Sequence, residues 1–107
     1  MPNIQAFMAT LKNDVVDFAQ SQFKDVKNEA IADGTAFVKG IESDLQNWMS
    51  QLAAGKISRD DLQWLVNAKK DDAQLEALKV AGLAQVRRDQ FVNGLLAVVV
   101  DAAINAT

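Results

Sequence analysis

The sequence predicts an all-α protein, built as a long antiparallel helical hairpin, from its composition, two apolar rows and one turn signal. Half of its 107 residues are apolar, glycine occurs five times, and the single proline is Pro2. Alanine, leucine, glutamine and lysine, which are frequent here, favour helix. This composition is typical of a folded globular protein rather than a disordered one. We therefore expect no β-strand.

The first helix is predicted over residues 3–54, with Asn3 as its N-cap. Apolar residues recur there at a spacing of eleven, in two rows: Ile4, Val15, Val26, Phe37 and Trp48, and Met8, Ala19, Ala30, Ile41 and Leu52. Eleven residues make three helical turns, so this hendecad pattern places both rows on one face. A continuous helix of this length would extend roughly 75 Å. Gly34 could end it, but the rows keep their phase across Gly34, which favours an unbroken or kinked helix.

The turn between the two helices is predicted at residues 55–58. Gly55 stands where a left-handed C-terminal cap is expected. Ser58 and Asp61 have the spacing of a capping box, in which each side chain accepts a hydrogen bond from the other residue's backbone N–H. The second helix is then predicted over residues 59–105, and both helices are roughly 45 to 50 residues long.

Three positions in the second helix leave its continuity open. The run Lys69 to Asp72 suits either a loop or an exposed helix face. Gly82 and Gly94 indicate either a break or a close approach of another chain segment. We expect a kink near Gly82, as near Gly34.

A single hairpin leaves apolar residues uncovered at the end where the two chain termini meet. We expect a second copy to cover them, giving a homo-oligomeric, coiled-coil-like bundle that is a dimer or tetramer of hairpins. The expected interface residues are Phe7, Leu11, Val16, Phe18, Leu96, Val98, Val100 and Ile104. The alternatives are a compact monomer with breaks at Gly34 and near Lys70 or Gly82, a lipid surface, or a helix from a different protein.

Arg87 and Arg88 interrupt the apolar stripe of the second helix. The hairpin register places them level with Asp25 and Glu29, whose carboxylates can accept hydrogen bonds from a guanidinium group. We interpret the two arginines and the two carboxylates as a polar pairing that fixes the register of the two helices, in preference to an anion site.

Several functional classes are disfavoured by composition. The chain has no cysteine and no histidine, which removes disulfides, thiol chemistry, imidazole catalysis and zinc sites with nitrogen or sulfur ligands. We assign its densest acidic group to helix capping and solvation, and so expect no metal, no cofactor and no enzymatic activity. That group is Asp60, Asp61, Asp71, Asp72 and Glu76.

The charge pattern and the aromatic residues also limit the possible partners. A net charge of −3 without a basic stripe disfavours nucleic acid, and the lack of a lysine and arginine excess disfavours anionic membranes. Trp48 and Trp64 are expected to fill the closed end of the hairpin. No secretory signal is recognised, so the expected location is the cytoplasm.

The eleven-residue period over residues 4–52 resembles the amphipathic repeats of exchangeable apolipoproteins and late-embryogenesis-abundant proteins. Those families also repeat their charges, whereas here Asp14 and Asp25 are followed at the next step by Ala36. We therefore assign no family. The function that the sequence favours is a non-enzymatic module for self-assembly or protein interaction, and the alternative is an amphipathic protein that binds a membrane surface.

Overall fold

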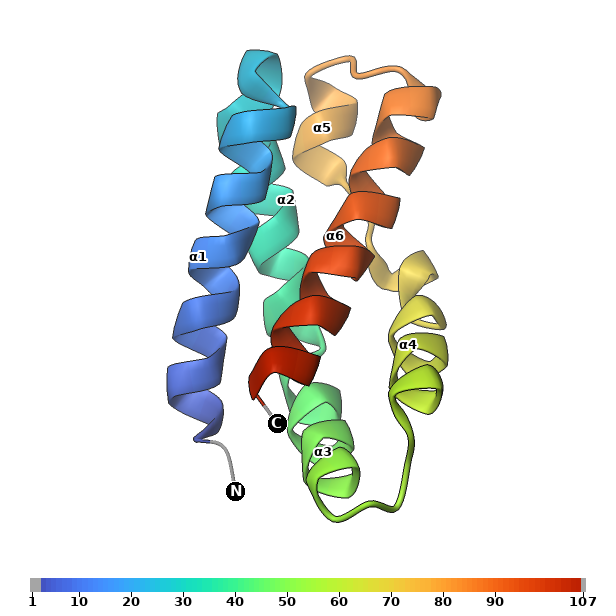
Figure 1. Ribbon diagram of the computed structural model, residues 1–107. Helices are drawn as coiled ribbons and strands as arrows, with labels where there is room; N and C mark the ends of the chain where they lie inside the picture. Colours follow the sequence, from blue (N-terminus) through green and yellow to red (C-terminus); the bar gives the residue numbers. More distant parts are fainter. Residues whose placement is uncertain (1–2, 107) are drawn as a thin grey trace.

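The computed structural model describes residues 3–106, and every regular element in that range is helical. The all-α prediction is confirmed, while residues 1, 2 and 107 lie outside the described residues. The elements are α1 (Ile4–Gln22), the 3₁₀ turn η1 (Lys24–Val26), α2 (Lys27–Gly40), α3 (Glu42–Ala53), α4 (Arg59–Asn67), the 3₁₀ turn η2 (Lys70–Asp72), α5 (Glu76–Val80) and α6 (Gln85–Ala106) (Figure 1).

The long hairpin is not what the structure shows. The predicted helix 3–54 is interrupted at Phe23, where the chain reverses so that α2 returns alongside α1 (Figure 1). The longest dimension of the described residues is 43 Å, far short of a rod of roughly 75 Å. Phe23 has non-helical dihedrals, φ −133° and ψ 51°, and its side chain is buried. Its ring lies 5.2 Å from the ring of Phe91, so burial of this side chain accompanies the end of the helix.

Gly34 does not end a helix, which agrees with the favoured prediction at this residue and differs from the compact alternative, which placed a break there. It lies inside α2 and is buried against α1 and α6. A β-carbon built on Gly34 would stand 2.6 Å from Cγ1 of Val15 and 3.4 Å from Cζ of Phe91. The glycine therefore permits close packing of helices, and the interruption after α2 falls instead at Ile41.

The predicted second helix, 59–105, is also wrong as a continuous element. It ends at Asn67, and the chain passes through η2 and the short α5 before α6 begins at Gln85. Gly82 does lie at a break, with φ +79° in the turn between α5 and α6. Gly94 instead marks a close approach, because a β-carbon there would lie 2.5 Å from the ring of Phe18.

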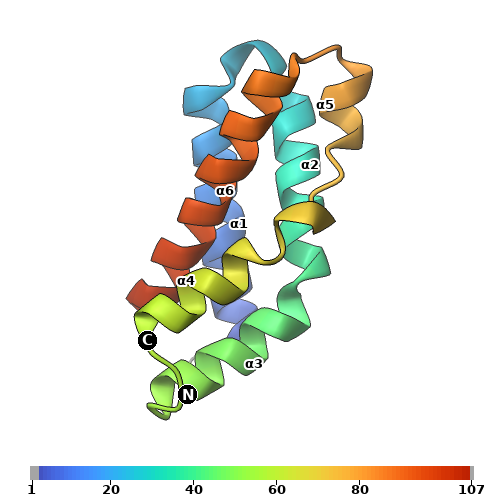
Figure 2. The ribbon, with the colours of Figure 1, turned by 90° about the vertical axis from the view of Figure 1, so that its right-hand side faces the viewer.

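The predicted turn at residues 55–58 is present and joins α3 to α4. Gly55 has a left-handed φ of +75°. The capping box is complete: Asp61 N–H donates to Ser58 Oγ at 3.0 Å, and Ser58 N–H donates to Asp61 Oδ2 at 2.9 Å. Figure 2 shows α3 and α4 diverging from this turn, at the end of the molecule where α6 finishes.

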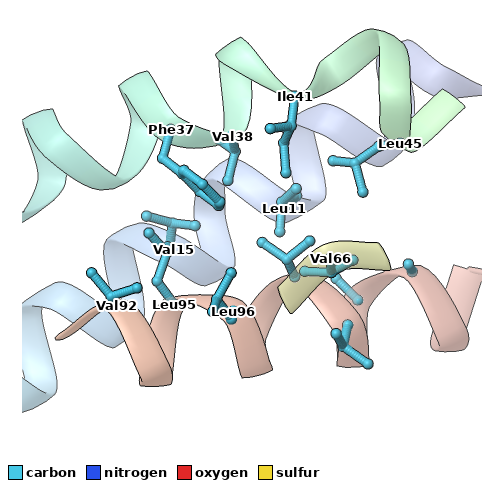
Figure 3. Packing of buried hydrophobic residues seen from close by; sticks show 14 of the residues in the cluster. Leu11, Val15, Phe37, Val38, Ile41, Leu45, Val66, Val92, Leu95 and Leu96 are labelled. Atoms are coloured by element: carbon cyan, nitrogen blue, oxygen red, sulfur yellow. The ribbon is translucent and has the colours of Figure 1, made fainter. Parts of the chain in front are cut away.

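The hydrophobic core lies between α1, α2 and α6, and is closed by side chains of the shorter helices. Figure 3 shows Leu11 and Val15 of α1 packed among Phe37 of α2, Ile41 between α2 and α3, and Leu95 of α6. No charged or polar side chain is buried within residues 3–106. The architecture is compact, as in the alternative to the long hairpin, and has its interruptions near Lys70 and Gly82, while the break in the first half of the chain falls at Phe23 and not at Gly34.

The start of α5 is fixed by a residue from another helix. Leu75, which precedes α5, has a left-handed φ of 54° and a buried side chain. Asp33 of α2 accepts hydrogen bonds from the backbone N–H groups of Ala77, at 3.1 Å, and Leu78, at 2.8 Å. A carboxylate at this position satisfies N–H groups that have no partner within α5.

Candidate functional site

The residues expected to form an oligomer interface are largely covered by the chain itself. Phe7, Leu11, Leu96 and Val100 belong to the buried core, at most 8% exposed. The remaining four are partly buried and, except for Val16, pack against that core: Val16, Phe18, Val98 and Ile104. The prediction assumed two straight helices, whereas α2 and α4 fold back over this region. The uncovered apolar end that motivated a second copy is therefore absent from the described residues.

The predicted polar pair is present in part. Arg87 donates from both terminal nitrogens to the two carboxylate oxygens of Asp25, at 2.6 and 2.8 Å, and its guanidinium carbon lies 5.6 Å from the centre of the Phe23 ring. The hydrogen bond from Arg87 lowers the pKa of Asp25 from 3.8 to about 2 and raises the pKa of the guanidinium. The structure gives Glu29 no ion pair with any described residue, and Arg88 donates instead to the carbonyl oxygen of Leu83.

The surface grooves do not gather chemically useful groups. One of about 500 Å³ lies between α1 and α2 and is lined by small and apolar residues together with Lys12, Lys39 and Glu42. Within residues 3–106, no three acidic side chains come together in a way that could hold a metal ion. None of the described helices has the length and apolar character needed to cross a bilayer.

Trp64 of α4 is the most unusual surface residue. Its side chain is 71% exposed, whereas Trp48 of α3 is 8% exposed and belongs to the core. The prediction that both tryptophans fill the closed end of a hairpin is wrong for Trp64. Tryptophan is highly buried on average in folded proteins, so an exposure of 71% distinguishes Trp64 from the other aromatic residues of the described chain.

The geometry of α4 explains why Trp64 faces outward. Leu62 and Val66 are fully buried, and each is two residues from Trp64. Two residues correspond to about 200° around a helix, so Trp64 lies on the side opposite the buried pair. Asp60 and Ala68, four residues away on either side, share its outward face and are exposed. The spacing of Leu62 and Val66 is the sequence signal that could have identified this surface.

Two further apolar side chains are exposed at the opposite end of the molecule. Val80, the last residue of α5, is 89% exposed, and Val86 in the first turn of α6 is 68% exposed. They flank the turn at Gly82 rather than lying on one helix face. We therefore take the outward face of α4, centred on Trp64, as the candidate functional site and call it the α4 face.

Comparisons with protein-family models, with curated proteins and with solved structures found no match to this chain.

Proposed function

We propose that the chain is a non-enzymatic helical interaction module whose contact surface is the α4 face. The exposure of Trp64 is the observation that carries this proposal. Tryptophan is enriched among the residues that contribute most to protein–protein binding, because it contributes a large contact area with little conformational freedom to lose. Burying the exposed part of such a side chain would contribute roughly 3 to 4 kcal/mol to binding.

The rest of the α4 face has the composition of an interface rim. Charged and polar residues lie near Trp64 on α4, among them Asp60, Gln63 and Asn67, all exposed. A central aromatic residue with a polar surround is the usual arrangement of a protein interface. The buried Leu62 and Val66 anchor α4 to the core, so the α4 face lies on a helix whose position is fixed.

Site-specific photo-crosslinking would test the proposal. A photoreactive phenylalanine analogue is placed at position 64 in living cells of the source organism, and crosslinked products are identified by mass spectrometry with the contact peptide mapped. The matched control places the same group at position 80, which is more exposed and also apolar in the native chain. We expect a defined protein product from position 64 and none from position 80.

Two results would contradict the proposal. One is the absence of any protein product from position 64. The other is a photo-crosslink from position 64 mainly to lipid. The membrane alternative also requires the fluorescence of Trp64 to shift to shorter wavelength when anionic vesicles are added to the purified chain.

A further inference from the structure

Two residues with left-handed backbone conformations bracket α5. Leu75 immediately precedes the helix with a φ of 54°, and Gly82 lies two residues beyond its end with a φ of +79°. This conformation is natural for glycine but unfavourable for leucine, because the β-carbon crowds the following carbonyl oxygen. We call residues 73–84, from the end of η2 to the start of α6, the α5 strap.

The helix in the strap is too short to be stable by itself. α5 contains five residues, and its hydrogen bonds include Lys79 N–H to the Leu75 carbonyl at 2.9 Å and Ala81 N–H to the Ala77 carbonyl at 3.0 Å. Fixing the first turn of a helix is more unfavourable than a few hydrogen bonds are favourable. The strap therefore keeps its shape through contacts with the rest of the chain.

Three leucines supply the apolar part of those contacts. Leu78 is fully buried, and Leu75 and Leu83 are 7% and 6% exposed. Leu75 lies beside Phe37 of α2 in the lining of a groove that α2 and the strap share. Burial of the Leu75 side chain thus holds this residue in a conformation that its backbone disfavours.

A side chain from outside the strap fixes each of its ends. At the start, the Asp33 carboxylate accepts hydrogen bonds from the N–H groups of Ala77 and Leu78. At the end, Nη1 of Arg88 in α6 donates to the carbonyl oxygen of Leu83 at 2.8 Å. Because Asp33 belongs to α2 and Arg88 to α6, the strap is attached to two different long helices.

The helices around the strap have contacts that do not involve it. The buried Leu62 and Val66 anchor α4, and Lys69, which follows α4, pairs with Asp44 of α3 at 3.0 Å. The long helices pack directly on one another, with α1 in contact with both α2 and α6. Release of the strap leaves all of these contacts intact.

We propose that the α5 strap opens and closes as one unit while the other helices stay folded. It pivots at Leu75 and Gly82, and Asp33 and Arg88 are the two latches that hold it closed. Opening uncovers the apolar surface under the three leucines, including the ring of Phe37, which is 5% exposed when the strap is closed. Folded proteins open locally in such units, with free energies below that of global unfolding. The strap is thus a conformational switch that controls access to an apolar surface, separate from the α4 face.

Hydrogen exchange tests the strap when one latch is changed and the amides at the opposite end are measured. Arg88→Met removes the donor to Leu83 and keeps an apolar stem. We expect the amides of Ala77 and Leu78 to exchange about tenfold faster in this variant, because a weakened latch raises the open population of the whole unit. Asp33→Ala should in turn accelerate the amide of Leu83, which donates to the Leu78 carbonyl, by about tenfold.

Three controls separate opening of the strap from unfolding of the whole chain. In the native protein, the three strap amides should share one protection factor and exchange at least about tenfold faster than the amides of Val15 and Leu95 in the long helices. Val86→Ala, at an exposed position of α6 near Arg88, should change strap exchange by less than about twofold. Trypsin cleavage after Lys79 should accelerate in Arg88→Met by the same factor as exchange, because proteolysis follows the open population.

Two results would overturn the strap. One is a native chain whose strap amides exchange no faster than those of Val15 and Leu95, which would show that α5 opens only when the whole chain unfolds. The other is acceleration confined to the amides beside the changed latch, which would show local loosening in place of a unit. Neither result bears on the α4 face, which photo-crosslinking from position 64 tests.

Discussion

The long helices and the segment between α3 and α6 are held in different ways. α1, α2 and α6 contain 19, 14 and 22 residues, and two of their contacts are close enough to require glycine, at Gly34 and Gly94. The intervening α4 and α5 contain only 9 and 5 residues. A few buried side chains hold α4 and α5 against the other helices. Asp33 also accepts hydrogen bonds from the start of α5, and Asp44 pairs with Lys69, which follows α4.

This difference separates the residues that stabilise the fold from those available for binding. In the three long helices most of the large apolar side chains are buried by packing within the chain, and Val86 at the start of α6 is exposed. In the segment from α4 to α5, short helices bury one side and leave the other exposed, as Trp64 and Val80 show. Surface-exposed side chains on a supported element are where binding is expected, whereas core residues mainly determine stability.

The largest effect is expected from the aromatic cluster of the long helices. Phe91 is fully buried, with its ring centre 5.6 Å from that of Phe18 and 5.2 Å from that of Phe23. Phe91→Ala should lower the free energy of unfolding by about 3 to 5 kcal/mol, because it leaves a cavity at this junction. Urea denaturation measures the change. Val86→Ala, at an exposed position of the same helix, should change the value by less than about 0.5 kcal/mol.

Two glycines in α2 provide a sharper comparison. Gly34→Ala introduces a methyl group into the contact with Val15 and should destabilise by about 1 to 3 kcal/mol. Gly40→Ala meets no atom within 4 Å and should stabilise by about 0.5 to 1 kcal/mol, because alanine restricts the unfolded chain more than glycine does. Equal effects of the two substitutions in urea denaturation would show that α1 and α2 do not pack as described.

The start of α5 tests the weaker segment. Asp33→Ala removes the acceptor for the N–H groups of Ala77 and Leu78 and should cost about 1 to 2 kcal/mol. Hydrogen exchange should accelerate at these two amides first. Asp17→Ala, which removes an exposed carboxylate from α1, serves as the control. Unchanged protection of both amides would exclude Asp33 as the cap.

The smallest effect concerns the exposed pair of Arg87 with Asp25. Because pairing lowers the folded-state pKa of Asp25 from 3.8 to about 2, its contribution to stability is present above pH 4 and is lost as the pH falls towards 2. The difference in melting temperature between the native chain and Asp25→Asn should therefore shrink over this interval. Arg87→Gln should raise the pKa of Asp25, measured by NMR titration, towards 3.8. A pKa that does not respond would contradict the pairing.

Local sequence signals predicted the helical class and the turn, but not how the helices are arranged. Gly55 and the Ser58–Asp61 box act within a few residues, so their role does not depend on the rest of the fold. The apolar rows continue in phase through the reversal at Phe23, although α1 and α2 are separate helices that each bury one side in the same core. A periodic pattern reports which side of each helix is buried, and it does not report whether the helix is continuous.

The candidate site was missed for a related reason. The expectation that Trp64 fills the closed end of a hairpin treats a large aromatic residue beside an apolar stripe as buried. The structure buries Leu62 and Val66 of that stripe, which directs Trp64 to solvent. The pairing of Arg87 with Asp25 was anticipated from the hairpin register, but it forms because the end of α1 and the start of α6 lie at the same end of the bundle (Figure 1).

The central claim is that the compact fold buries Trp48 and presents Trp64, and the fluorescence of single-tryptophan variants tests it most directly. Trp48→Phe leaves only Trp64, and Trp64→Phe leaves only Trp48. We expect the emission of Trp64 to lie at long wavelength and to be readily quenched by iodide. The emission of Trp48 should lie at short wavelength and be protected from iodide. Equal protection of the two tryptophans, as a hairpin closed by both side chains would give, would contradict the account.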